Sequence, residues 1–174
     1  MTARKAVLLI VLSMVLVPCV YSVSSIGFGL DAASAQDAAF GQGSVQLAGD
    51  LRATVSDEFQ IRVPLALSMC DGSMLFEAGM QIVYYPWFKG PFMSLSLFQL
   101  GFSSQCENLD NIVNLNEVSI GWTFTFGPGI FVEPSLVVRD PSGTFSDEYS
   151  SLKGTFPCYT SFRGRLVVGW FFWR

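Results

Sequence analysis

The feature that most constrains this chain is a repeated alternation of apolar residues with small or polar ones. From Phe59 to Met69 every odd position is apolar, whereas the even positions include Gln60 and Arg62. Successive side chains of a strand point to opposite faces, so a period of two predicts a β-strand with one apolar face. The same alternation runs over 45–55, and a three-residue polar turn separates the two segments. Together they predict a β-hairpin.

The alternation recurs along the rest of the chain. Further strands are predicted over 74–84, 118–126, 130–138 and 162–172. Two other segments are less regular: 92–102 changes phase at Phe98, which indicates a bulge, and 144–156 is weakly strand-like. Counting both gives about eight strands. After the N-terminal segment described below, no apolar run reaches the ~18 residues of a transmembrane helix. The sequence therefore predicts an all-β fold, a closed antiparallel up-and-down transmembrane β-barrel.

Two prolines argue against this register. Pro64 and Pro134 each fall within a predicted strand. Proline has no N–H group, so each would remove one hydrogen bond from the ladder.

The composition of the polar face indicates whether that face points into the barrel or out to solvent. Charged residues make up 14% of the chain, whereas a soluble domain carries about 25%. The charged residues on the polar face are acids and arginines in nearly equal number, without lysine: Asp50, Arg52, Arg62, Glu77, Glu117, Glu133, Arg139, Arg163 and Arg165. Arginine pairs with carboxylates through several hydrogen bonds, which suits an enclosed interior. The alternative is a soluble barrel or sandwich with this face exposed to water.

The N-terminal segment has the character of a targeting sequence. Arg4-Lys5 precedes an apolar run, and Ala33-Ser34-Ala35 matches a signal-peptidase site. We therefore predict a cleaved signal peptide over 1–35 and a barrel domain over 36–174. Cleavage near Ser22 or Ser25 is an alternative, and an uncleaved membrane anchor is another.

Several kinds of chemistry have little support in the sequence. The chain has no histidine, the usual general base of hydrolytic sites, so we predict no catalytic residues and no enzyme activity. Beyond the signal peptide three cysteines remain, Cys70, Cys106 and Cys158, without the close pairing of a zinc site. No metal and no cofactor are expected. The net charge of −4 and the lack of a basic tract argue against nucleic-acid binding.

The C-terminal segment RLVVGWFFWR resembles the terminal strand of bacterial outer-membrane β-barrel proteins. Counting back from Arg174, the alternate positions Phe172, Trp170, Val168 and Leu166 are apolar or aromatic. Arg174 departs from the pattern, in which phenylalanine is typical. Chain length, signal and strand count are similar to those of the small eight-stranded families, the OmpW-like, OmpX-like and OmpA-type barrels. The resemblance implies location in the outer membrane, contact with its lipid, and recognition of the last strand by the barrel-assembly machinery.

Two functions follow from the resemblance. An OmpW-like barrel implies a narrow channel or relay for a small-molecule solute. We then expect Arg62, Glu77, Glu133, Arg139, Arg163 and Arg165 to line its lumen. The alternative is a structural or surface-interaction barrel, adhesin-like and without transport, in which the same residues form a paired network that fills the interior. Eight strands leave little lumen once side chains occupy it, so a wide aqueous pore is excluded.

Overall fold

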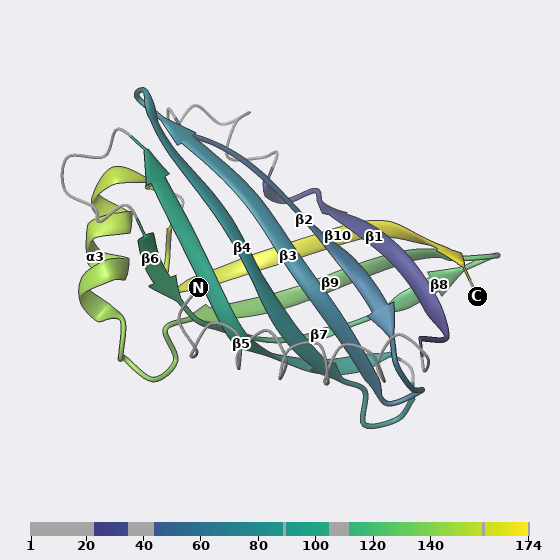
Figure 1. The fold of residues 1–174 in the computed structure, drawn as a ribbon. Coiled ribbons are helices and arrows are strands. Elements are labelled where there is room, and N and C mark those ends of the chain that lie inside the picture. Colours follow the sequence, from purple (N-terminus) through teal and green to yellow (C-terminus); the bar gives the residue numbers. More distant parts are fainter. Residues whose placement is uncertain (1–22, 35–43, 89, 105–111, 158, 174) are drawn as a thin grey trace, which may run out of the picture.

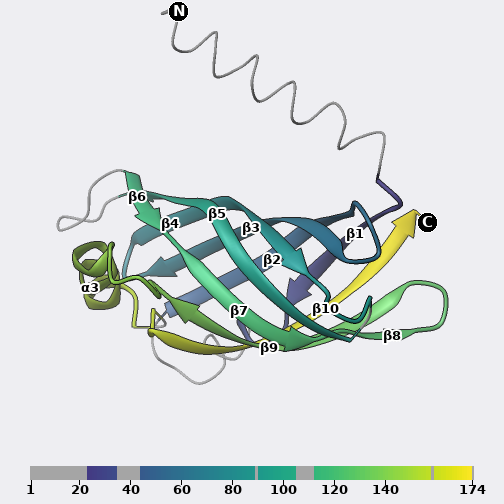
Figure 2. The ribbon, with the colours of Figure 1, turned by 90° about the horizontal axis from the view of Figure 1, so that it is seen from below.

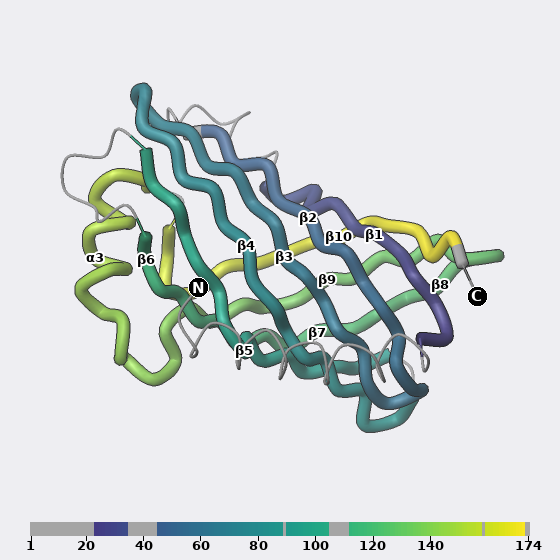
Figure 3. The backbone as a smooth tube through the Cα atoms, viewed as in Figure 1, coloured from purple at the N-terminus to yellow at the C-terminus, as the bar shows by residue number. Residues whose placement is uncertain are grey.

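The computed structural model describes residues 23–34, 44–88, 90–104, 112–157 and 159–173. These residues form a closed antiparallel β-barrel with one short helix (Figures 1 and 3). The elements are β1 (Ser25–Asp31), β2 (Ser44–Thr54), β3 (Phe59–Cys70), β4 (Ser73–Tyr84), β5 (Pro91–Ser104), β6 (Ile112–Leu115), β7 (Glu117–Trp122), β8 (Phe124–Phe126), β9 (Ile130–Arg139), α3 (Ser146–Thr155) and β10 (Phe162–Trp173).

The strands close into a ring of eight. Their order is β10-β1-β2-β3-β4-β5-β7-β9, and β10 also pairs with β9. Strands β6, β7 and β8 follow one another along a single barrel strand, which is interrupted at Asn116 and Thr123; β6 and β7 pair with β5, and β7 and β8 pair with β9. The predicted eight-stranded antiparallel barrel is therefore confirmed.

The irregularities predicted from the sequence lie where pairing is broken. The register between β4 and β5 shifts next to Met80, and Leu97 and Phe98 both point outward, which is the expected bulge. Pro64 lies within a gap in the pairing between β3 and β4, together with Val63. Pro134 likewise lies beside the gap between β7 and β8 on its neighbouring strand. The missing N–H group of each proline therefore coincides with an interruption of the ladder.

Two segments differ from the sequence prediction: 144–156 is not a strand, and 25–31 is one. The number of barrel strands therefore remains eight. Residues 144–156, predicted as a weak strand, contain the helix α3 instead. Asp147 and Glu148 lie in its first turn and Lys153 in its last, a distribution that complements the helix dipole. No helix among the described residues is long and apolar enough to cross a membrane.

The eighth barrel strand is β1, which lies inside the segment predicted to be a signal peptide. It pairs with β2 on one side and β10 on the other, so it completes the ring. The barrel therefore starts at Ser25, ahead of the predicted domain boundary at residue 36. Cleavage after Ala35 would remove β1, whereas the alternative site near Ser22 would retain it. The peptide over residues 1–22 lies outside the described residues, and its cleavage stays a prediction.

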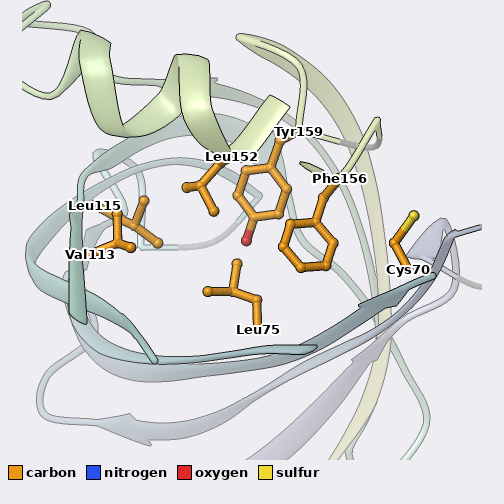
Figure 4. Close-up of a cluster of buried hydrophobic side chains, with 7 residues drawn as sticks. All are labelled: Cys70, Leu75, Val113, Leu115, Leu152, Phe156 and Tyr159. Carbon is orange, nitrogen blue, oxygen red and sulfur yellow. The ribbon is translucent and has the colours of Figure 1, made fainter. Parts of the chain in front are cut away.

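The helix α3 closes one end of the barrel. Leu152, Phe156 and Tyr159 pack onto buried residues at the ends of the strands, with Tyr149 beside them. Figure 4 shows this cluster, which we call the α3 cap: Cys70, Leu75, Val113, Leu115, Leu152, Phe156 and Tyr159. Cys70 is a free, buried thiol within it, whereas Cys106 and Cys158 lie outside the described residues.

A tyrosine attaches α3 to a break in the barrel wall. The Tyr149 hydroxyl donates to the Asn116 carbonyl at 2.8 Å and accepts from the Asn116 N–H at 3.2 Å. Asn116 separates β6 from β7, so its backbone groups bond with the tyrosine. Burial raises the pKa of the Tyr149 phenol, which keeps it protonated and able to donate.

Candidate functional site

The candidate site is the interior of the barrel, because every charged residue of the described strands points into it. Five are acids and five are arginines, so their formal charges cancel: Asp31, Asp50, Glu77, Glu117, Glu133, Arg52, Arg62, Arg139, Arg163 and Arg165. The six residues predicted to line the lumen are all in this set. Asp31 was not predicted, because it falls within the segment assigned to the signal peptide.

Glu133 on β9 is the centre of the interior network. Arg62 on β3 donates to its two carboxylate oxygens at 2.5 and 2.9 Å. Arg52 on β2 donates to the same oxygens at 2.8 and 3.3 Å. None of the three residues is more than 1% exposed. One carboxylate therefore holds two guanidinium groups in the middle of the lumen.

The arginines beside Glu133 have further partners. Arg52 and Arg165 both donate to Asp50, which lies on β2. The Arg52 guanidinium also lies 4.1 Å from the centre of the Phe131 ring, at cation–π distance. These contacts extend the network to β10.

Neutral side chains complete the hydrogen bonds around Arg62 and Glu133. Arg62 donates to Gln60 at 2.7 Å and to the Tyr85 hydroxyl at 2.8 Å. Thr123 donates to Glu133 at 2.7 Å. The alternation placed Thr123 on the polar face of the strand predicted over 118–126, whereas Tyr85 lies just past the strand predicted over 74–84. We call the eight residues Asp50, Arg52, Gln60, Arg62, Tyr85, Thr123, Glu133 and Arg165 the central network.

A second group of charges lies between the central network and the α3 cap. Arg163 donates to Asp31 at 3.1 Å and also to Gln46. Arg139 donates to Glu117 at 2.9 Å, and its guanidinium lies 4.3 Å from the centre of the Tyr159 ring in the cap. The interior is therefore filled by charged and aromatic side chains from the central network to the cap.

A small cavity of about 40 Å³ remains in this second layer. Glu77, Gln99 and Arg165 line it, and Glu77 accepts from Gln99 at 3.0 Å. The atoms Glu77 Oε1, Gln99 Oε1 and Arg165 Nε have no hydrogen-bond partner among the described residues. A space of this size takes only a few water molecules, and such molecules would satisfy the three atoms.

The end of the barrel opposite α3 is open and holds a larger hollow, which we call the vestibule. Its volume is about 350 Å³. Of the twelve described residues that line it, seven carry hydroxyl groups, and two of these, Tyr85 and Thr123, also belong to the central network. The central network is thus the floor of the vestibule.

The outer surface of the barrel is apolar. In the described strands none of the charged residues lies on it, whereas large hydrophobic side chains are exposed on all eight barrel strands. Leu65 and Leu136 are 36% and 45% exposed. The three tryptophans with described side chains, Trp87, Trp122 and Trp170, are 48–70% exposed and lie toward the end opposite α3 (Figure 2 shows the strands of this end).

The described residues contain no group of three or more cysteine, aspartate or glutamate side chains placed to hold a metal ion. Four of the five interior acids, Asp31, Asp50, Glu117 and Glu133, are instead paired with arginines. Arginine–carboxylate pairs of this kind fix the geometry of both side chains.

Comparison with known proteins identifies no family for this chain. No family model matches it, and no curated protein matches it. Among solved structures it is similar to a de novo designed transmembrane β-barrel, TMB2.3, with 8% sequence identity and a TM-score of 0.47. The similarity covers 88% of this chain and 98% of the designed one.

Proposed function

We propose that this protein is a transmembrane β-barrel with a closed lumen, a structural or surface-interaction barrel of the outer membrane rather than a channel. The observation that carries this proposal is the contact of Arg62 and Arg52 with Glu133 in the middle of the lumen. The Arg62–Glu133 pair connects strands on opposite sides of the ring, and between the central network and the α3 cap a cavity of about 40 Å³ remains. A solute cannot pass without separating buried charges, which is costly.

The outer surface supports insertion into a bilayer. Hydrocarbon requires that every backbone group be paired within the protein, and a closed barrel satisfies this requirement. It also disfavours charge on the surface, and the charged residues of the described strands all point inward. Exposed tryptophans toward one end fit an aromatic girdle at a membrane interface.

The lengths of the connections support an orientation. At the end opposite α3 the turns between consecutive strands are short, over 55–58, 85–90 and 127–129. At the other end the turn over 71–72 is also short, but the three remaining connections, over 32–43, 105–111 and 140–161, are longer, and the last contains α3. Outer-membrane barrels have short periplasmic turns and longer extracellular loops. We therefore orient α3 to the outside, where it is available to a partner.

The last strand supports the proposed recognition by the assembly machinery. Leu166, Val168, Trp170 and Phe172 of β10 are 39–62% exposed on the outer surface. These are the alternate positions of the terminal-strand pattern.

The proposal is tested by reconstitution. The full chain should fractionate with membranes, require detergent for extraction, and show a heat-dependent shift on a gel. In planar bilayers the folded protein should be electrically silent. Stepwise conductance of the wild type would support the channel or relay instead. Recovery of a soluble monomer without detergent would exclude the membrane barrel itself.

A further inference from the structure

We propose that the vestibule is a binding site for a small neutral polyol, such as one sugar ring. The vestibule is a blind cavity: its walls are the ends of the strands opposite α3, and the central network closes its floor. Its volume of about 350 Å³ falls in the range of about 300–1,000 Å³ that is typical of ligand sites. The proposal goes beyond the closed barrel and does not depend on passage of the ligand.

The walls offer neutral hydroxyl groups that can both donate and accept. Thr54 Oγ1 accepts from Ser25 at 2.7 Å and from Gln60 at 3.3 Å, which leaves its own proton available. Thr125 Oγ1 lines the vestibule and has no hydrogen-bond partner among the described residues. A ligand with several hydroxyl groups matches such a wall, because each group can take either role.

The charges around the vestibule disfavour an ionic ligand. Asp57, at the exposed rim, is the single charged residue among the described residues that line it. The positive charge of Arg62, in the floor, is already paired with Glu133. Within the part of the lining that the structure describes, an anion would meet Asp57 and no free positive group, and a cation would have one solvated carboxylate, a weak partner.

An aromatic side chain at the rim provides an apolar surface for the ligand. Phe88 lines the vestibule, is 58% exposed, and has φ 63°. A bulky residue is rarely found in this left-handed region, and such strain is concentrated at functional positions. Phe171 adds a second ring to the lining from β10. The C–H face of a sugar ring can lie against an aromatic ring while its hydroxyl groups bond to the wall.

The test is calorimetric titration of the full-chain protein in detergent micelles. The probes are D-glucose, D-galactose and myo-inositol, with choline chloride and sodium phosphate as ionic comparators. We expect saturable binding of at least one of the three polyols and none of the two ions. Preference for choline or phosphate, or no saturable binding of any polyol, would overturn the proposal.

Two variants locate the site. Thr125→Val removes the free hydroxyl at nearly constant volume and should weaken polyol binding about tenfold, the effect of one lost hydrogen bond. Thr144→Val, next to α3, is the matched control and should bind like the wild type. Phe88→Gly removes the ring but suits the positive φ, so it should keep or raise the midpoint of the heat-dependent gel shift while binding is lost. Unchanged binding in both vestibule variants would also refute the site.

Because binding is measured in detergent, the outcome is separable from that of the closed barrel. A silent bilayer recording with no polyol binding refutes the vestibule site alone. A conducting barrel that binds a polyol refutes the closed lumen alone.

Discussion

Arg62 and Glu133 stand on strands that face each other across the barrel and are joined by two hydrogen bonds. Around the ring, β4, β5 and β7 separate β3 from β9 on one side, and β2, β1 and β10 separate them on the other. The two nitrogens of Arg62 reach both carboxylate oxygens of Glu133 at 2.5 and 2.9 Å. The pair therefore links β3 and β9 directly across the lumen.

We expect Glu133→Gln to lower the stability of the barrel without opening it. The change leaves the buried guanidinium groups of Arg52 and Arg62 without their shared counter-charge, and breaking a buried pair costs about 3–5 kcal/mol. The measurement is denaturant unfolding of the detergent-solubilised protein. Asp147→Asn on the exposed side of α3 is the control and should have little effect. Conductance of Glu133→Gln in bilayers, with stability unchanged, would mean that the group gates a pore.

We expect the two faces of β3 to tolerate substitution differently. Leu65 lies near the middle of β3 and is exposed on the outer surface. Leu65→Arg should cost about 2–4 kcal/mol if this surface contacts the centre of a bilayer. The adjacent Ala66 lines the small interior cavity, and Ala66→Ser should cost much less. The cost of each substitution is measured from the yield of folded protein in lipid vesicles as the denaturant concentration is lowered. Equal tolerance would contradict the assignment of the faces.

The seam between β1 and β10 should depend on the absence of a side chain at Gly169. Gly169 pairs with Gly29, and a Cβ atom there would collide with the Phe28 carbonyl oxygen and the Phe131 ring. Backbone cannot yield easily, so Gly169→Ala should cost about 1–3 kcal/mol by overpacking. Gly164→Ala, on the same strand with no neighbour within 4 Å, is the matched control. The midpoint temperature of the heat-dependent gel shift should be lower for Gly169→Ala than for the wild type and unchanged for Gly164→Ala.

We expect the mature protein to begin before Ser25. Strand β1 pairs with β2 on one side and with β10 on the other, so its loss would leave these two strands with unpaired edges. The hydrocarbon of a bilayer does not tolerate an open sheet edge. Intact-mass analysis of protein purified from membranes gives the N-terminus directly. A mature chain that starts at Gln36 and still shows the heat-dependent shift would contradict the closure through β1.

The sequence by itself determined most of the strands and the direction of their side chains. The period of two is local, because alternate side chains of a strand must point to opposite faces. It therefore placed the hairpin of β2 and β3, the bulge before Phe98 and the inward arginines without reference to any partner strand. The same local signals failed for β1, whose short alternation follows an apolar run that has the pattern of a signal peptide.

Only the tertiary structure decided how the ring closes and which charges meet. Arg62 and Glu133 are 71 residues apart, and their contact depends on strand order and register, which no local pattern encodes. The same holds for α3: residues 146–155 become helical where Leu152 can pack over the end of the barrel. The segment has only a weak local preference for helix, and the helix is stabilised by burying Leu152 against the ends of the strands. The surface formed by these strand ends exists only after the barrel has assembled.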